Sequence, residues 1–268
     1  MIQAELFVER DMETEGEVHS FVNGETAVYT SRTPENQTPN EDCAALFAID
    51  SHAGVLVVAD GMGGMPLGKE ASHLCINAIQ SSLESIKDPY SGLREVILNG
   101  IEQANQEVSG LNVGAASTLA IVEIVGDLVR PYHIGDSSIL VVGQKGKVKL
   151  YTVSHSPVGY AVEAGFLDES EAMHHEERHI VSNMIGSADM RIEVGPTLKL
   201  APKDTLLIAS DGLFDNFQLD EIQDRIRKGS LRTIMQALIN EARRRMVQPI
   251  EGYPSKPDDL TFILYRQK

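Results

Sequence analysis

The sequence predicts an α+β protein in which groups of short strands alternate with pairs of amphipathic helices. Short apolar runs rich in valine and isoleucine are separated by turn residues, which is typical of strands with short connections. Apolar residues recur at spacings of three and four over 71–108 and over 219–247, which predicts a helical pair in each range. Because no repeat, low-complexity segment or long linker interrupts the chain, we expect one domain over residues 1–268.

The composition is that of a globular protein, with 42% hydrophobic and 23% charged residues. A formal net charge of −16 argues against nucleic acid and against an anionic membrane as partners, because clustered lysine and arginine bind phosphate groups. The N-terminus lacks the basic and apolar regions of a secretion signal, and no window approaches about 18 apolar residues. We therefore expect a cytoplasmic protein in which Cys43 and Cys75 are reduced and buried.

The first sixty residues predict strands connected by turns and by one long loop. Residues 1–26 are acidic and weakly patterned, with Asn23-Gly24 as a turn between two extended pieces. Residues 33–40 have the composition of a loop, and this loop leads to Glu41-Asp42. The expected strands are residues 27–31, 44–49 and 55–59, of which the last two form a hairpin.

The remaining chain predicts two helical pairs, an antiparallel meander and a polar excursion. The expected helices cover residues 71–86, 93–108, 219–228 and 231–247. The expected strands cover residues 119–125, 128–134, 139–142, 148–153, 192–198, 205–209 and 260–265. Strands between 117 and 153 follow one another with short connections, which predicts a meander. Residues 155–191 are polar and rich in histidine, so we expect an exposed excursion with short helices.

Asp60 stands at the end of a buried strand. It follows the apolar run 55–59 and precedes three glycines among the next four residues, Gly61, Gly63 and Gly64. Glycine permits tight turns and close approaches that other residues cannot make. An ionised aspartate in this position is costly unless a cation meets it, and the sequence offers no basic residue nearby before Lys69. A metal ion is the natural candidate.

Further carboxylates stand at the edges of other predicted strands. A single aspartate at a strand end is commonly a turn former, but a repeated pattern favours a shared site. Carboxylates, a backbone carbonyl and water are the ligands that suit Mg²⁺ and Mn²⁺, whereas zinc favours histidine and cysteine. The pattern therefore predicts a magnesium or manganese centre. The acids at these edges are Glu41, Asp42, Asp60, Asp136, Asp211 and Asp258.

Taken in order, these stretches resemble the motifs of the metal-dependent protein serine/threonine phosphatases of type 2C, in their bacterial form. The series spans residues 40–265, which makes the resemblance specific although each motif alone is weak. The matching stretches are Asn40-Glu41-Asp42, Val58-Ala59-Asp60-Gly61-Met62-Gly63-Gly64, Gly114-Ala115-Ala116-Ser117-Thr118-Leu119-Ala120, His133-Ile134-Gly135-Asp136-Ser137, Ser210-Asp211-Gly212-Leu213-Phe214-Asp215 and Asp258-Asp259-Leu260-Thr261.

The resemblance implies a fold, a cofactor and a reaction. The fold is a four-layer α/β/β/α sandwich, with two antiparallel sheets face to face and a pair of helices on each outer side. The cofactors are two or three Mn²⁺ or Mg²⁺ ions. The reaction is hydrolysis of phosphoserine and phosphothreonine in proteins by direct attack of a hydroxide that bridges two ions, since two cations lower the pKa of a shared water.

The resemblance also implies roles for the acids, carried over by position. Asp60, Asp211, Asp258, Glu41 and Asp42 form the implied catalytic set. For the metal ions, the implied ligands are Asp60, the Gly61 carbonyl, Asp211 and Asp258, with Glu41 and Asp42 acting mostly through bound water and with Asp136 and Asp211 holding a third, weaker ion.

Three departures concern phosphate binding and the surroundings of the ions. The family usually has an arginine where this chain has Gln37, and Arg32 is the nearest substitute although its offset differs. Met65 and Ser138 replace a histidine and an arginine of many members. Arg178 lies in the excursion that corresponds to the family's flap, where it either contacts substrate or is solvated. Because glutamine replaces a bidentate arginine poorly, the departures predict weaker phosphate affinity rather than weaker metal affinity.

Two other functions compete with this one. His175-Glu176-Glu177-Arg178-His179 fits the zinc metallopeptidase pattern, although its flanks are polar and no third ligand is evident. A phosphatase fold that binds a phosphoprotein or a kinase without turnover is the second alternative, which the absence of the arginine favours and the intact acids oppose.

We expect phosphorylated proteins as partners, with a serine/threonine kinase as a further candidate, and a monomer.

Overall fold

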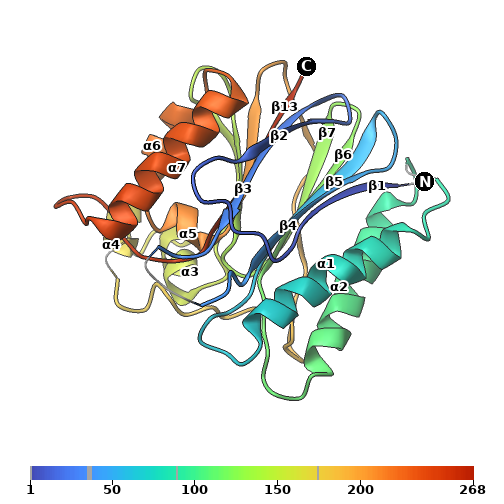
Figure 1. Ribbon diagram of the computed structural model, residues 1–268, viewed down its shortest axis with the longest axis horizontal. Coiled ribbons are helices and arrows are strands. Elements are labelled where there is room, and N and C mark those ends of the chain that lie inside the picture. Colours follow the sequence, from blue (N-terminus) through green and yellow to red (C-terminus); the bar gives the residue numbers. More distant parts are fainter. Residues whose placement is uncertain (1, 35–37, 89, 174) are drawn as a thin grey trace.

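The strands of the chain form two antiparallel sheets, each assembled from segments far apart in the sequence (Figure 1). The computed structural model describes residues 2–34, 38–88, 90–173 and 175–268. Sheet A has the order β1-β4-β5-β6-β7-β10, and β11 also pairs with β7. Its strands are β1 (Gln3–Phe7), β4 (Asp42–Ala48), β5 (Ala53–Asp60), β6 (Leu119–Val125), β7 (Leu128–Ile134), β10 (Glu193–Val194) and β11 (Leu198–Lys199).

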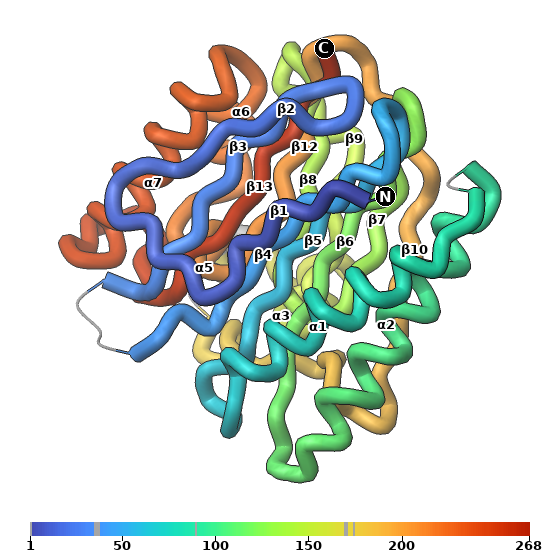
Figure 2. The backbone as a smooth tube through the Cα atoms, turned by 45° about the vertical axis from the view of Figure 1, so that its right-hand side comes forward, coloured from blue at the N-terminus to red at the C-terminus, as the bar shows by residue number. Residues whose placement is uncertain are grey.

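Sheet B has the order β2-β3-β13-β12-β8-β9, so that the last strand of the chain lies inside the sheet. Figure 2 shows this strand, β13, between β3 and β12. The strands of sheet B are β2 (Glu17–Phe21), β3 (Gly24–Ser31), β8 (Ser138–Val142), β9 (Val148–Tyr151), β12 (Thr205–Ala209) and β13 (Leu260–Gln267). Early and late segments of the chain therefore depend on each other.

Helices cover the outer face of each sheet (Figure 1). The pair α1 and α2 packs on sheet A, and the group α5, α6 and α7 packs on sheet B. The helices are α1 (Gly68–Leu83), α2 (Leu93–Ser109), α3 (Pro157–Glu163), α4 (Glu169–Ala172), α5 (Asp211–Phe214), α6 (Leu219–Ile226) and α7 (Leu231–Val247). No helix among the described residues is long and apolar enough to span a bilayer.

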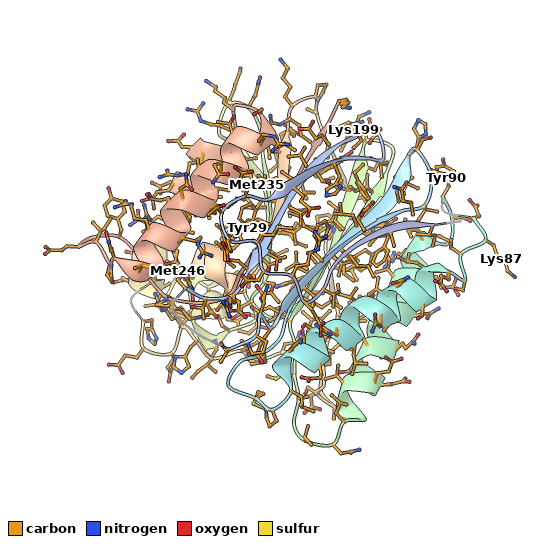
Figure 3. All side chains as sticks on the ribbon, in the orientation of Figure 1. Tyr29, Lys87, Tyr90, Lys199, Met235 and Met246 are labelled. Carbon is orange, nitrogen blue, oxygen red and sulfur yellow. The ribbon has the colours of Figure 1, made fainter. Side chains whose placement is uncertain are left out.

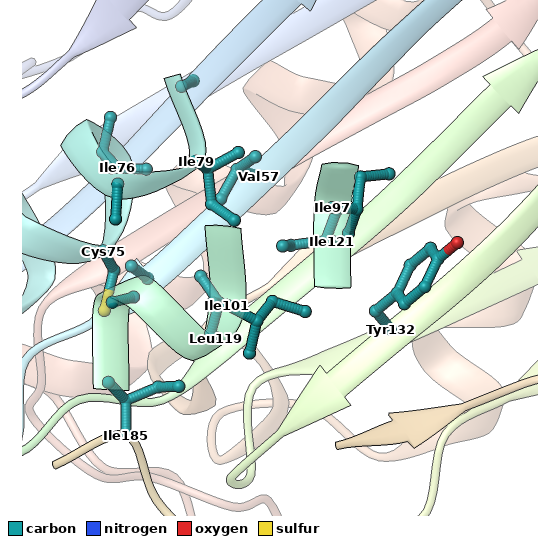
Figure 4. Packing of buried hydrophobic residues seen from close by; sticks show 14 of the residues in the cluster. Val57, Cys75, Ile76, Ile79, Ile97, Ile101, Leu119, Ile121, Tyr132 and Ile185 are labelled. Carbon is teal, nitrogen blue, oxygen red and sulfur yellow. The ribbon is translucent and has the colours of Figure 1, made fainter. Parts of the chain in front are cut away.

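Strict alternation along the strands creates the layers. In β5, Val55 and Val57 face the helices α1 and α2, whereas Leu56 and Val58 face sheet B. Successive side chains of a strand point to opposite faces, so one apolar run supplies two cores. Figure 4 shows the first of these cores, where the side chains of the two helices meet those of sheet A. A second core fills the space between the sheets and a third lies under α7, which confirms the four-layer sandwich.

The helix α7 shows how the outer layer is fixed. Ser230 caps its N-terminus by accepting a hydrogen bond from the backbone N–H of Thr233. Its apolar stripe includes Met235 and Met246, which pack in the same core as Tyr29 of β3 (Figure 3). Full burial of each such side chain stabilises the fold by about 1.5 to 3 kcal/mol. The helix is thus held by its apolar face and by its cap.

Most predicted elements are confirmed, but the predicted meander is wrong in its centre. The strands β6 and β7 pair with each other, and so do β8 and β9. However, β7 belongs to sheet A and β8 to sheet B, so the chain passes between the sheets at 135–137. Gly135 has a φ of +103°, a conformation that favours glycine. Asp136 therefore lies at a crossing between sheets rather than in a hairpin.

Two predictions after residue 153 also need correction. The excursion 155–191 is not exposed throughout, because His155, Asn183 and Ile185 are buried and Ile185 exchanges two backbone hydrogen bonds with Ser117. The strand predicted over 192–198 is two short strands, β10 and β11. Gly195-Pro196 separates them, and proline cannot donate a ladder hydrogen bond.

Candidate metal centre

The predicted acids converge where strands of both sheets end. Asp42 begins β4 and Asp60 ends β5, and the two residues are direct partners across these antiparallel strands. Asp211 follows β12 at the start of α5, and Asp258 precedes β13. Asp136 lies at the crossing from β7 to β8. Two sheets therefore bring five aspartates, separated by up to about two hundred residues, to one place.

The glycine turn after Asp60 wraps around the carboxylate of Glu41. The Gly61 backbone N–H donates to the Glu41 carbonyl at 3.1 Å. A Cβ atom at Gly63 or Gly68 would lie 2.9 or 2.8 Å from an oxygen of the Glu41 carboxylate. The backbone N–H of Lys69, in the first turn of α1, donates to this carboxylate at 3.3 Å. The glycines thus provide the space in which Glu41 approaches the centre.

A second close approach joins Asp211 to the end of the chain. A Cβ atom at Gly212 would lie 1.8 Å from the Asp259 carbonyl oxygen, so only glycine fits there. Ser210, one residue before Asp211, donates its hydroxyl to Asp42 Oδ2 at 2.8 Å. Asp42 therefore has a hydrogen-bond donor in the residue that follows β12, and Asp211 lies beside the 258–259 pair.

Asp259 belongs to the centre although the sequence analysis assigned it no role. Its Oδ1 accepts the backbone N–H of Thr33, and its Oδ2 accepts that of Glu41, both at 2.7 Å. The carboxylate thereby ties residues on both sides of the loop that precedes Glu41. An asparagine offers one acceptor oxygen, so it could not accept both bonds with separate oxygens. This geometry gives a physical reason for an aspartate at position 259.

Mutual repulsion and burial raise the pKa values of the clustered aspartates. The pKa of Asp60 is well above its usual range because the residue is buried and because Asp42, Asp211, Asp136 and Asp258 carry like charges nearby. Burial, followed by the charge of Asp211, raises the pKa of Asp136 to about 8 and that of Asp258 to about 7. Oxygen donors that repel one another in a buried place fit a hard divalent cation such as Mg²⁺ or Mn²⁺.

Lys256 is the second residue of the centre that the sequence analysis missed. Its Nζ lies 2.5 Å from Asp211 Oδ2, 2.8 Å from Asp215 Oδ2 and 3.0 Å from Asp258 Oδ2. Burial opposes the charge of the ammonium, but these carboxylates raise the pKa of Lys256 above its usual value. The position of a lysine two residues before Asp258 is the only signal that the sequence carried for this contact.

The candidates for substrate binding have different surroundings. Arg32 pairs with Asp11, with its Nε 2.9 Å from Asp11 Oδ2, so its guanidinium is engaged at the surface. Gln37 lies outside the described residues. Arg178 lies close enough to the acids for its charge to lower the pKa of Asp215, although burial raises that pKa overall. It lines an open cavity of about 290 Å³ together with Met173, His175, Tyr253, Pro254 and Ser255.

The zinc motif does not form the geometry that a metallopeptidase needs. Residues 176–179 form turns rather than a helix, so His175 and His179 do not share one helical face. Another cluster, His133, His155 and Glu193, offers ligand atoms within 4.8 Å of one another.

Hydrogen bonds assign the protonation of His155 in that cluster. Its Nδ1 accepts from the Gly135 backbone N–H at 3.1 Å and from the Asn183 amide at 2.9 Å. The amide orientation is fixed because Asn183 also donates to the Arg191 carbonyl and accepts the Arg191 N–H. His155 Nε2 therefore carries the proton and donates to Glu193 at 2.9 Å, which makes this nitrogen a donor rather than a metal ligand.

The four-layer fold and the carboxylate centre at the edge of both sheets define a metal-dependent protein phosphatase. A family model described as protein phosphatase 2C matches residues 31–248, which is most of the chain. The chain belongs to the protein phosphatase 2C family.

Relatives and solved structures agree with this family. A protein of Streptococcus pyogenes serotype M6, named as a phosphatase of the 2C type, is 32% identical over 197 residues, which cover 70% of this chain and 78% of that protein. The solved serine/threonine phosphatase of S. agalactiae is 29% identical, with a TM-score of 0.78, and the match covers 91% of this chain and 100% of that one.

A second solved structure shares the fold and contains metal. It is the catalytic domain of the serine/threonine protein phosphatase PstP in complex with two manganese ions. It is 22% identical to this chain, with a TM-score of 0.69, and the match covers 90% of this chain and 96% of that one.

Proposed function

We propose that this chain is a Mn²⁺- or Mg²⁺-dependent phosphatase that hydrolyses phosphoserine and phosphothreonine in proteins. The observation that carries the proposal is the convergence of buried aspartates where strands of both sheets end, at which burial and like charges raise the pKa values of Asp60, Asp136 and Asp258. Family membership and the named activities of the relatives support it.

Each part of the centre has a proposed task. Asp60, the Gly61 carbonyl, Asp211 and Asp258 would hold two divalent ions, with Glu41 and Asp42 behind bound water and Asp136 with Asp211 at a third position. When bound, the ions would supply an acidified water and would offset charge on the phosphoryl oxygens. Ser210 orients Asp42 through its hydroxyl, and the glycine turn keeps Glu41 in the centre. We assign no covalent nucleophile to the chain.

The surroundings of the centre support proposals about substrate and location. Phosphorylated proteins are the substrates that the family implies, and Arg178 beside the cavity is a candidate contact for them. We propose a cytoplasmic monomer in which residues 1–268 act as one unit and which opposes a serine/threonine kinase. Cys43 and Cys75 are buried free thiols, as in proteins of reducing compartments. The net charge of −16 disfavours nucleic acid and anionic membranes as partners.

Hydrolysis of a phosphothreonine peptide tests the proposal. We expect turnover with Mn²⁺ and none with a chelator. Asp60→Ala and Asp211→Asn should each lower the rate by roughly a thousandfold or more, because the ions contribute several kcal/mol to the transition state. The matched control is Asp127→Asn, which removes an exposed carboxylate that pairs with Lys199 at a sheet turn. Metal binding without turnover would instead support a module that only binds phosphoproteins.

A further inference from the structure

The ammonium of Lys256 has a complete set of carboxylate partners. It carries three N–H donors, and three different aspartates, Asp211, Asp215 and Asp258, lie within 3.0 Å of its Nζ. Only 24% of the side chain is exposed. This cation therefore belongs to the interior of the acidic centre rather than to its solvated rim.

The backbone of Lys256 is fixed independently of these ion pairs. The fully buried Asn216 accepts the Lys256 N–H with its Oδ1 at 3.0 Å and donates its Nδ2 to the Lys256 carbonyl at 2.8 Å. The preceding residue, Ser255, donates its hydroxyl to the carbonyl of Arg245 at 2.8 Å. The contacts with Asn216 and with the Arg245 carbonyl thus fix the backbone at this position, and the lysine side chain extends from it to the aspartates.

Two of the three partners are also proposed metal ligands. Asp211 and Asp258 would hold a divalent ion under the proposed function, whereas Asp215 stands outside that ligand set. An ammonium and a divalent cation that share the same carboxylates repel each other strongly at separations of a few ångströms. Ion entry therefore requires Lys256 to withdraw from Asp211 and Asp258, and Asp215 offers a place to which it can withdraw.

We propose that Lys256 is an internal cation that competes with the divalent ion for Asp211 and Asp258. It stabilises the metal-free centre and raises the ion concentration at which the centre fills. The lysine is thus a positioning and gating residue of the centre, and its effect appears in metal binding. The inference rests on the proposed function for the choice of ligands, but it concerns binding rather than hydrolysis.

Calorimetric titration of the purified full chain with Mn²⁺ tests the competition. Lys256→Met should bind Mn²⁺ tighter by on the order of tenfold or more, because the competing charge is gone. Lys256→Arg keeps the charge and should stay within about threefold of the wild type. Lys199→Met is the matched control, because it removes the same charge from an ion pair with Asp127 at the outer end of sheet A (Figure 3). Unchanged or weaker Mn²⁺ binding by Lys256→Met, or an equal gain in Lys199→Met, would overturn the proposal.

Thermal melting provides a second measurement that does not depend on catalysis. In chelator, the melting temperature of Lys256→Met should be lower than that of the wild type. Addition of Mn²⁺ should then raise the melting temperature of Lys256→Met more than it raises that of the wild type. If Lys256→Met fails to fold, the same Mn²⁺ titration of Asp215→Asn tests the competition instead. This variant leaves the lysine with Asp211 and Asp258 as its carboxylate partners and no alternative to which it can withdraw, so Mn²⁺ binding should weaken several-fold, whereas unchanged binding contradicts the competition.

The outcomes separate the two proposals. Mn²⁺ binding that follows the expected order, without hydrolysis of the phosphopeptide, would support the role of Lys256 and reject the phosphatase. A complete lack of Mn²⁺ binding in all variants would reject both.

Discussion

Charged side chains are buried at two neighbouring sites in this molecule, the cluster around Arg245 and the metal centre. The two sites differ in how far opposite charges balance one another. Around Arg245 the charges are matched, since the guanidinium makes a bidentate pair with Glu221 at 2.6 and 2.8 Å and also bonds Glu241 and the Asn216 carbonyl. The guanidinium also stacks against the rings of Phe217 and Tyr253. In the metal centre, Asp211, Asp215 and Asp258 share the single ammonium of Lys256, and burial and the charges of neighbouring aspartates raise the pKa of Asp60.

The pKa shifts of the two places have opposite signs. Burial raises the pKa of Glu221, but hydrogen bonds from Arg245 outweigh it and the net shift is downward. Hydrogen bonds from Arg244 and then Arg245 lower the pKa of Glu241 to about 2. In the centre, burial and like charges raise the pKa of Asp136 to about 8. The balanced charges around Arg245 stabilise the fold. In the metal centre the carboxylates repel one another, and a bound cation would reduce that repulsion.

Arg245→Met should produce the largest change in stability. It leaves Glu221 partly buried without its partner, which costs about 3 to 5 kcal/mol in the free energy of unfolding. Urea unfolding in chelator measures this loss. A cost below about 1 kcal/mol would show that the cluster is not the matched structural unit described above.

Asp60→Asn should shift stability in the other direction. In chelator at pH 8, the neutral amide avoids the cost of either ionising or protonating this buried carboxyl group and should stabilise the metal-free protein by about 1 to 3 kcal/mol. The same unfolding experiment measures the gain, and addition of Mn²⁺ should then stabilise the variant less than the wild type. A loss of stability in chelator would argue that the aspartates do not repel one another as the geometry indicates.

The pH dependence of the metal-free protein should reveal the raised pKa values. Between about pH 4 and pH 8 the folded state keeps the proton of Asp136, whereas the unfolded state has released it. This stabilising contribution is therefore full at low pH and is lost as pH rises through about 8. We expect the stability of the wild type relative to Asp136→Asn to fall by about 3 kcal/mol from pH 5.5 to pH 8. Thermal melts of both proteins across this range measure the difference, and a constant difference would contradict the shift.

Arg244→Ala should have the smallest effect. Its hydrogen bond is the leading cause of the low pKa of Glu241, but the Arg244 side chain is 49% exposed and water screens the pair. We therefore expect urea unfolding of this variant to match that of the wild type closely. Comparison with Arg245→Met, one residue away, then separates burial from charge as the source of stability.

Local patterns were sufficient to predict most of the fold. The hairpin of β4 and β5 and the helices α1, α2 and α7 follow from apolar periodicity, which burial on one or both faces imposes on a sequence. The assignment of β7 and β8 to different sheets could not be predicted, because both stretches have the pattern of strands and only pairing with distant strands separates them.

The site was predictable to the extent that its residues occupy strand ends. The acids at Asp60, Asp136 and Asp211 carry that signal. Lys256, Asp215 and Asp259 were missed because their roles depend on tertiary contacts, such as that between Lys256 and Asp211, forty-five residues apart in sequence. No local periodicity encodes such a contact, since it exists only after α7 has packed on sheet B.

The central place of β13 in sheet B has a consequence for how the enzyme is made. The ribosome delivers Asp60 long before Asp258, Asp259 and β13, and at about 5 to 20 residues per second the delay is roughly 10 to 40 s. Until then β3 and β12 lack their shared neighbour, and the loop before Glu41 lacks its anchor at Asp259. A nascent chain therefore exists for most of its translation without a complete centre, so phosphate removal can begin only once synthesis has passed β13.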